Sequence, residues 1–314
     1  MTNRRNLLER ERHVNGSHFH LIYETLLTAL MTGVGSSNEG NHPWIRVSTV
    51  ELNERTGHRV ASLDSGFSFA LDLQLGGDAL LPVIDMRRLF PRTAAAELAW
   101  FVNGTQDIAF LHQLGVRIWD KFQEPDGTVE AAYGYRWRQH FRRDQLLMAM
   151  ETLRENPTDR RIWVSTWDPA VDGLGRPSRN APCPVGFSLS VVGGMLNSTY
   201  VLRSSDVFVG LPYDVMNQSL LMDTVAAELG LGVGTLQVSI AHPHLYDSHF
   251  ELTRQMLELY QLHGDFPPTR LRMVMPGWSV SRILEDPAGY VRSVEVASAD
   301  LDWPDFNPRP ELIA

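Results

Sequence analysis

Residues 203–215 read RSSDVFVGLPYDV, and the segments on either side of them predict the architecture. Before them, Met195–Leu202 is the second strand that we expect from a hairpin. Gly193-Gly194 predicts a tight hairpin that joins this strand to another over Phe187–Val192. After them, Val215–Leu229 has the apolar spacing of a long helix. A strand hairpin followed directly by a helix favours an α+β fold over a regular alternation of strands and helices.

The rest of the chain has the same mixture of helical and strand-like patterns. It contains no G-x-G-x-x-G or Walker A motif, and no repeat or low-complexity linker divides it. We therefore predict one α+β domain over residues 1–314. The other expected elements are a helix over Ser17–Met31, a strand over Phe67–Leu73, a helix over Thr93–Val102 capped by Thr93 and ending near Gly104, a strand over Arg161–Trp167, and Gly230 as the end of the long helix.

Composition and charge exclude several classes of function. The 314 residues are 43% hydrophobic and 21% charged, which is typical of a globular protein. No apolar run is long enough for a membrane span, and the charged segment Met1–His13 is not typical of a signal peptide. A formal net charge of −9 argues against broad nucleic-acid binding, whereas a small phosphorylated ligand needs only a few arginines. A single cysteine fits a reducing cytoplasm, or a host cytoplasm if a phage encodes the chain.

That single cysteine, Cys183, stands between two prolines in Ala181-Pro182-Cys183-Pro184. The prolines hold the backbone in extended or turn conformations and remove amide donors. A lone cysteine can be a small buried hydrophobic residue. It can also be a nucleophile if nearby cations favour its thiolate, because only the thiolate attacks. The segment by itself leaves both interpretations open.

Two segments resemble signatures of the thymidylate synthase and pyrimidine hydroxymethylase family. They are RSSDVFVGLPYDV from Arg203 and AHPHLYDSH from Ala241. The resemblance covers about Asn53 to His249, with a weaker echo in the C-terminal FNPRPELIA. It implies a thymidylate synthase-like fold, in which helices flank a mixed β-sheet and one sheet face forms a homodimer interface. Further matching pieces follow in the family's order: Arg55-Thr56-Gly57, Glu97 in AELAWFVNGTQDIAFLH, Ile118-Trp119-Asp120, Tyr133-Gly134 with Trp137-Arg138, and Asp159-Arg160-Arg161.

The resemblance implies a set of catalytic residues. Cys183 would attack C6 of a pyrimidine nucleotide, and Arg203 would favour its thiolate. Glu97 lies in an otherwise apolar segment, where an unpaired carboxylate would be costly. It is therefore either a hydrogen-bonded structural residue or the glutamate that organises water and proton transfer in the family. The implied catalytic set is Cys183, Glu97, Tyr133, Asp214 and Arg203.

The same resemblance implies two binding sites. The co-substrate 5,10-methylenetetrahydrofolate would contact Trp119, Asp206 and Gly210. Arginine is preferred at a phosphate site because its planar fork matches the phosphate oxygens. No metal site is expected, because His242-Pro243-His244 has no third ligand at a recognisable spacing. The implied nucleotide-binding residues are Arg55, Arg160, Arg161, Arg203, Ser204, Ser205, Asp206, Asp214, His244 and Tyr246, with Arg160 and Arg161 reaching the partner subunit's site in a homodimer.

Two positions depart from thymidylate synthases and indicate a different base. Asp214 stands where those enzymes have asparagine, and aspartate at this position is typical of the deoxycytidylate hydroxymethylases. Asp214 can accept a hydrogen bond from N4 of cytosine, while a proton held on Asp214 or on N3 makes the second bond. An ionised Asp214 facing O4 of uracil would oppose two acceptors. The second departure is Pro184, which replaces a histidine and is compatible with altered chemistry.

The predicted reaction transfers a one-carbon unit to C5 of dCMP and hydrates it, giving 5-hydroxymethyl-dCMP and tetrahydrofolate. Arg161 and Ser204 look like residues of the deoxynucleotide-using members, which favours dCMP over CMP. Three alternatives stay open: a CMP hydroxymethylase, a thymidylate synthase that methylates dUMP, and a catalytically idle relative that binds a nucleotide or RNA. A zinc-dependent deaminase is excluded, because one cysteine cannot supply its ligand set.

Overall fold

The computed structural model describes residues 13–15, 19–35, 48–54, 56–63, 65–75, 78–84, 86–173, 175, 180–263, 271–272 and 277–298. Arg55 of the expected phosphate site lies outside these residues, and so does the C-terminal segment FNPRPELIA. Among the described helices, none is long and apolar enough to cross a membrane.

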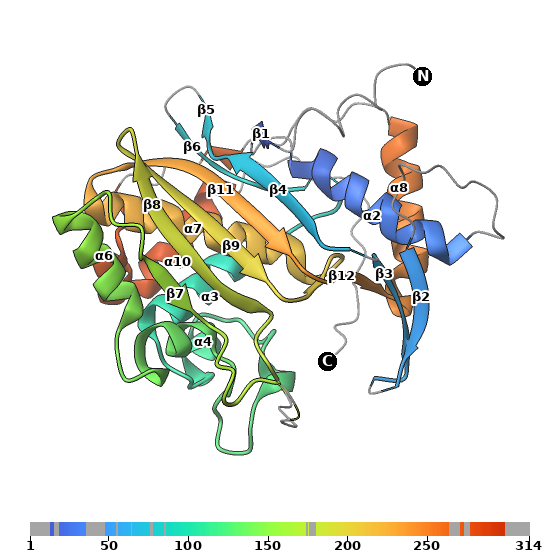
Figure 1. The fold of residues 1–314 in the computed structure, drawn as a ribbon, viewed down its shortest axis with the longest axis horizontal. Coiled ribbons are helices and arrows are strands. Elements are labelled where there is room, and N and C mark those ends of the chain that lie inside the picture. The colour runs from blue at the N-terminus through green and yellow to red at the C-terminus, as the bar shows by residue number, and fades with distance from the viewer. Residues whose placement is uncertain are drawn as a thin grey trace.

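A six-stranded mixed sheet forms the centre of the structure (Figure 1). The neighbouring strands β9 and β11 run parallel, whereas β9 pairs antiparallel with β8 and β11 pairs antiparallel with β4. This arrangement confirms the predicted mixed sheet. In spatial order the strands are β1 (His13–Asn15), β4 (Phe67–Asp72), β11 (Gly232–Ile240), β9 (Met195–Leu202), β8 (Pro184–Val192) and β7 (Trp163–Ser165).

Two smaller sheets lie beside the central one. In the first, β10 pairs parallel with β12, which aligns Asp206 with His244. In the second, β6 pairs with both β5 and β13. The strands of the first are β10 (Ser205–Asp206), β12 (Pro243–Tyr246), β3 (His58–Leu63) and β2 (Ser48–Asn53), and those of the second are β13 (Leu271–Arg272), β6 (Asp78–Leu81) and β5 (Gln74–Leu75).

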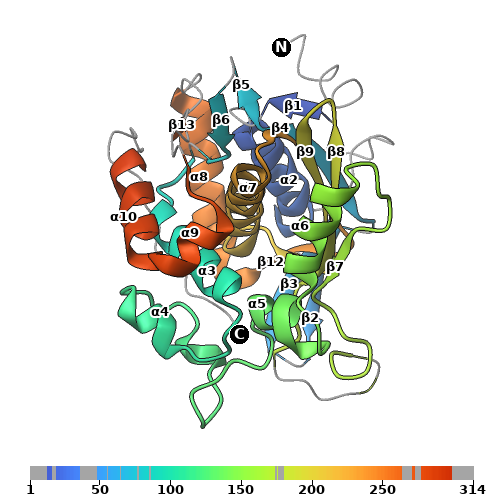
Figure 2. The same cartoon turned by 90° about the vertical axis from the view of Figure 1, so that its left-hand side faces the viewer.

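Helices stack outward from one face of the central sheet (Figure 2). Helix α7 (Gly210–Leu229) packs on β9 and β11, α3 (Pro91–Asn103) packs on α7, and α10 (Pro287–Ser298) packs on α3. The opposite face carries partly exposed small polar side chains, such as the paired Ser68 and Ser239. The other helical segments are α2 (Phe19–Gly35), α4 (Ala109–Gln113), η2 (Asp120–Phe122), α5 (Tyr133–Tyr135), the π-helical turn η3 (Arg136–His140), α6 (Gln145–Glu155), η4 (Asp247–His249), α8 (Phe250–His263) and α9 (Val280–Glu285).

The expected elements are all present, but several boundaries differ. Helix α3 begins at Pro91 rather than after a Thr93 cap, because proline fits the first turn of a helix and has no amide hydrogen to satisfy there. The long helix α7 begins at Gly210, five residues before the expected Val215. Its start is held by Asp206, whose Oδ1 accepts hydrogen bonds from the amides of Phe208 and Val209.

The remaining differences are smaller. Helix α2 continues to Gly35, beyond the expected end at Met31, and β7 is confined to Trp163–Ser165 within the expected strand Arg161–Trp167. The hairpin at Gly193-Gly194 is confirmed, with φ of 59° and 78°, and Gly230 ends α7 in the left-handed conformation. Gly104 ends α3 in the same way.

Candidate active site

The segment before β8 holds Cys183 beside the guanidinium group of Arg203. Arg203 Nε donates to the carbonyl oxygen of Pro182 at 2.9 Å, and its Nη2 donates to that of Ala181 at 2.9 Å. The backbone amide of Arg203 also donates to the carbonyl of Cys183 at 2.9 Å. Three hydrogen bonds from one residue therefore fix the turn that presents the thiol.

The predicted catalytic residues come from four separate parts of the chain and meet in one partly buried site. Cys183 precedes β8, Glu97 lies on α3, Tyr133 on α5 and Asp214 on α7. The pKa of Tyr133 is raised well above its usual range by burial first, and then by the charges of Cys183, Asp214 and Glu97. Tyr133 is thus within electrostatic reach of the other three residues.

Burial dominates the acid–base state of this site. It raises the pKa of Asp214 to about 8, with smaller contributions from the charges of Glu97 and Asp206. It raises the pKa of Glu97 to about 7 against two hydrogen bonds that favour the anion. It also raises the pKa of Cys183 to about 11, and Arg203 opposes that shift only in part. The charge of Arg203 thus favours the thiolate, but burial outweighs it.

Glu97 is held by two side chains from different elements. Trp119 Nε1 donates to Glu97 Oε1 at 2.7 Å, and Asn217 Nδ2 donates to Oε2 at 3.4 Å. The Trp119 ring also lies 5.5 Å from the ring of Tyr133. The indole predicted to contact the co-substrate is therefore bonded directly to the predicted catalytic glutamate.

A second group of predicted residues lies where β10 and β12 pair. Ser204 Oγ lies 3.1 Å from His244 Nδ1, and the ring of His244 is 5.1 Å from that of Tyr246. Burial lowers the pKa of His244, which favours a neutral imidazole. Ser205 is buried, and among the described residues its hydroxyl oxygen has no hydrogen-bond partner. These groups form a polar cluster with unused hydrogen-bonding capacity.

Gly210, predicted to contact the co-substrate, is the first residue of α7. A Cβ added there would lie 3.7 Å from Asp214 Oδ2, which is an ordinary contact. No clash within the chain therefore requires a glycine at this position.

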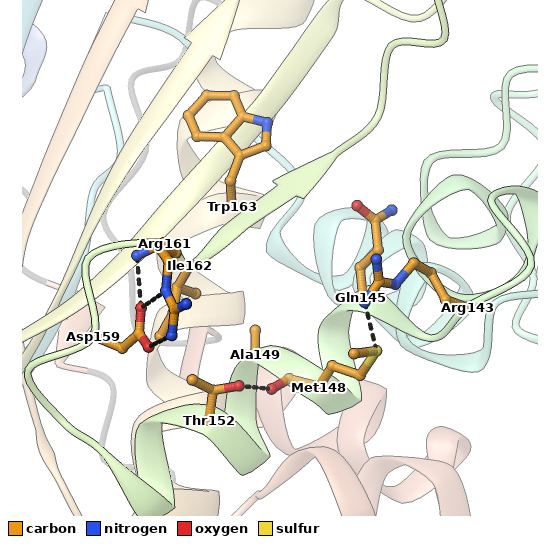
Figure 3. A pocket seen from close by; sticks show the side chains of 9 residues that line it. All are labelled: Arg143, Gln145, Met148, Ala149, Thr152, Asp159, Arg161, Ile162 and Trp163. Carbon is orange, nitrogen blue, oxygen red and sulfur yellow. Dashed lines mark hydrogen bonds and ion pairs between the residues drawn. The ribbon is translucent and has the colours of Figure 1, made fainter.

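Arg160 and Arg161 are not brought to this site within the chain. Both are exposed, and Arg161 donates from Nη2 to Asp159 Oδ2 at 2.7 Å, with its side chain 89% exposed. Figure 3 shows Arg161 and Asp159 on the wall of a pocket that also includes Trp163 and Arg143. Among the described residues, no hydrogen bond or ion pair joins either arginine to Cys183 or Ser204.

Three residues at the site were not predicted from the sequence. Tyr200 of β9 is buried, and burial is the main cause of its raised pKa. The charges of Asp214, Tyr133 and Cys183 raise the pKa further. Asn217 binds Glu97, and its position three residues after Asp214 on a helix was a signal that could have found it. The ring of Trp167 lies 5.2 Å from the guanidinium carbon of Arg203, and no sequence pattern marked it.

The segment that leads to Cys183 begins at a buried ionic cluster. Arg136 donates to both carboxylate oxygens of Asp172, at 2.9 and 3.2 Å, and each side chain is 1% exposed. His140 Nε2 lies 2.6 Å from Asp168 Oδ2, and the Asp168 amide donates to Asp172. Because Trp167 precedes Asp168, this cluster also fixes the ring beneath Arg203.

In the described part of the chain, no group of three or more His, Cys, Asp or Glu side chains could hold a metal ion. A family model described as thymidylate synthase matches residues 45–276, which is more than half of the chain. Enzymes of that family are folate-dependent transferases that transfer one-carbon units to pyrimidine nucleotides. The match includes every residue of the buried site described above, and the chain belongs to the thymidylate synthase family.

Proposed function

We propose that the protein is a deoxycytidylate 5-hydroxymethylase that uses 5,10-methylenetetrahydrofolate. The observation that carries the proposal is the aspartate at position 214, which lies on α7 within the candidate site; burial raises its pKa to about 8, and this favours the protonated carboxyl group at neutral pH. A protonated carboxyl group has one donor and one acceptor. It can donate to N3 of cytosine and accept from N4, which satisfies that edge of the base.

Asp214 also suits the activation of the base. When Cys183 bonds to C6, negative charge develops on the ring, and a proton delivered to N3 from Asp214 neutralises it. The thiol proton must leave first, and the pKa of about 11 makes this step unfavourable in the unliganded protein. Glu97, with its pKa near 7, is the nearby group able to accept a proton at neutral pH.

The remaining steps follow from the covalent adduct. C5 bonds to the methylene carbon that the folate supplies, and the two bonds from that carbon to the folate nitrogens break in turn, the first as C5 attacks and the second as the C5 proton leaves. Loss of the C5 proton leaves an exocyclic methylene group on the ring. Water directed by Glu97 and Asn217 adds to this group, and the Cys183–C6 bond then breaks to restore the aromatic base. The products are 5-hydroxymethyl-dCMP and tetrahydrofolate.

Phosphate binding is proposed to be shared between two subunits. Arg203 and Ser204 lie at the site in one chain, whereas exposed Arg161 points elsewhere and is held only by Asp159. Beside it, Trp163 is 43% exposed, which is unusual for so large an apolar side chain and fits an interface between subunits. A homodimer across the open face of the central sheet would supply Arg160 and Arg161 to the partner subunit's site.

The residues present also fit a folate. Trp119 offers an aromatic surface, and Asp206 keeps Oδ2 without a donor among the described residues. A carboxylate oxygen of this kind can accept from the ring N–H of the pterin. The start of α7 at Gly210 adds no side chain to obstruct the ligand.

The test is a product assay with dCMP, CMP and dUMP in parallel, each with methylenetetrahydrofolate, read by mass spectrometry and by absorbance for dihydrofolate. We expect a hydroxymethyl group on dCMP and no dihydrofolate. A hydroxymethyl group on CMP in preference to dCMP would show that the sugar assignment is wrong. A methyl group on dUMP with dihydrofolate would make the protein a thymidylate synthase, and no product from any nucleotide would favour an idle relative.

The covalent step has its own prediction. Cys183→Ala should reduce turnover at least about 10⁴-fold, because no other group in the site can form the bond to C6. Binding of dCMP, measured by calorimetry, should change less than about tenfold, since base and phosphate contacts remain. Turnover that survives the substitution would rule out Cys183 as the nucleophile.

A further inference from the structure

Lys121 is the only lysine in the chain, which otherwise uses 27 arginines as its permanent cations. It lies on the turn η2, next but one to Trp119, and its Nζ atom is buried. No described residue accepts a hydrogen bond from that atom. A buried ammonium group without an acceptor is unfavourable, so its retention requires an explanation.

The surroundings of Lys121 belong to the candidate active site. Its Nζ lies 5.1 Å from the centre of the Phe122 ring, and that ring lies 5.4 Å from the ring of Trp119. Asn180, in the segment that leads to Cys183, donates to the carbonyl of Phe122 at 3.0 Å and so fixes the turn. Lys121 is therefore held between the indole that binds Glu97 and the segment that carries the thiol.

The electrostatics of Lys121 connect it with Asp206. Burial lowers the pKa of Lys121, and the charge of Asp206 partly opposes this shift. The two groups do not form an ion pair within 4 Å, however, although both are described. The Oδ1 atom of Asp206 accepts hydrogen bonds from the amides of Phe208 and Val209, whereas its Oδ2 atom accepts none from the described residues. The ammonium group of Lys121 thus lies within electrostatic reach of Asp206 without bonding to it.

We propose that Lys121 is a specificity residue for the co-substrate, and that it donates a hydrogen bond to the ring carbonyl of the pterin while Asp206 accepts from the adjacent ring N–H. The pterin carries this N–H next to its C4 carbonyl, so an acceptor and a donor side by side match that edge. Lysine suits the task because a compact ammonium can reach one oxygen, whereas the planar fork of arginine needs two acceptors.

This inference rests on the proposed use of a folate, and its test separates the two. The full chain, saturated with dCMP, is titrated with tetrahydrofolate and with its 4-amino-4-deoxy analogue, which replaces the carbonyl by an amino group. We expect wild-type protein to prefer the carbonyl form by roughly 10- to 100-fold, the usual range for a hydrogen bond to a charged group. In Lys121→Met this preference should fall at least about fivefold, and the part that remains belongs to Asp206, because the analogue also lacks the ring N–H; the affinity for dCMP should be unchanged.

Further measurements distinguish recognition of the pterin by Lys121 from a purely structural role of this residue. Lys121→Met should leave the unfolding temperature of the unliganded protein equal or higher, because it removes a buried unpaired charge. Arg117→Met is the matched control: it removes an exposed cation three residues before Asp120, and it should leave the ratio of affinities unchanged. Because there is one lysine, protein labelled with ¹³C-lysine should give a single side-chain Cε signal that shifts with tetrahydrofolate.

The possible results have distinct meanings. Equal weakening of both ligands in Lys121→Met would overturn the assignment to the carbonyl and place the ammonium on a group that both ligands share. Equal binding of both ligands by wild-type protein would overturn it as well. If wild-type protein binds dCMP but neither folate, the proposed function fails, and this inference fails with it.

Discussion

At Asp214 a carboxyl group replaces an amide of nearly the same size. The amide carries a fixed donor and a fixed acceptor, whereas the carboxyl group can give its proton to the ligand. Burial and the nearby charges of Glu97 and Asp206 raise the pKa of Asp214 to about 8, which favours a proton available to N3 of cytosine at neutral pH. The choice of base is thus proposed to depend on one transferable proton.

Asp214→Asn should reverse the preference between bases. The amide cannot protonate N3 of cytosine, but it can donate to O4 of uracil and accept from N3. Because a positioned proton donor contributes about 10² to 10⁴ in rate, we expect the ratio of kcat/KM for dCMP over dUMP to fall at least about 100-fold. Steady-state assays with both nucleotides give this ratio. An unchanged ratio would remove Asp214 from base selection.

The same proton predicts a pH dependence. The pKa of Asp214 is raised from its ordinary value to about 8, so the group is protonated below about pH 8 and ionised above it. The kcat/KM for dCMP should therefore fall as pH rises through about 8. Asp214→Asn should lack this falling limb in whatever activity it keeps, so a limb that persists in the variant would have to come from another group.

Helix α7 contains a buried carboxyl group whose effect on the free energy of unfolding can be measured separately from catalysis. Burial raises the pKa of Asp223 on this helix to about 7, and no described residue donates to its carboxylate. The folded state therefore favours the protonated form, and the stability that it contributes is lost as pH rises through about 7. Asp223→Asn should raise the free energy of unfolding more at pH 8 than at pH 4, by up to about 4 kcal/mol.

Urea unfolding of both proteins at the two pH values gives this comparison. Asp144→Asn and Asp126→Asn are unsuitable controls, because Asp144 caps α6 and Asp126 accepts two hydrogen bonds from Thr128. Asp72→Asn tests the same chemical change at a partly exposed site. An equal gain at both pH values would mean that the carboxyl group of Asp223 does not titrate with folding.

The turn η3 and the segment after β7 are joined by a buried ion pair. Arg136→Met would leave Asp172 as an uncompensated buried charge, so we expect a loss of about 3–5 kcal/mol in the free energy of unfolding. Arg136→Met with Asp172→Leu should recover most of that loss, because the unpaired charge is gone. Chemical denaturation of the three proteins tests this, and additive losses in the double variant would contradict the direct pairing.

Among the helices and strands, the pattern of apolar residues predicted several of the elements that the structure contains. The strands around Gly193-Gly194 and the end of α7 at Gly230 follow from local patterns, and the structure confirms them. The start of α7 at Gly210 could not be read in this way, because it depends on the side chain of Asp206. Tyr200 and Lys121 were missed for a related reason: their positions relative to the site are set by distant segments.

The whole molecule is proposed to work as a pair of chains, and mixing variants tests this. Cys183→Ala and Arg161→Ala homodimers should each be nearly inactive. After mixing and subunit exchange, half of the dimers would contain one chain of each kind, and one of their two sites would have both Cys183 and Arg161 intact. About a quarter of wild-type activity should return. No recovery, with exchange verified by mass spectrometry, would show that Arg161 serves its own chain.

The pairing of β4 with β11 has a consequence for synthesis on the ribosome. Leu71 lies opposite Leu236, so the apolar strand Phe67–Asp72 leaves the ribosome about 165 residues before its partner. At roughly 5–20 residues per second, this strand waits about 8 to 30 s without its neighbour in the sheet. The nascent chain therefore exposes the unpaired edge of β4 for many seconds. The yield of folded protein in cells should depend on chaperones that bind this edge during that interval.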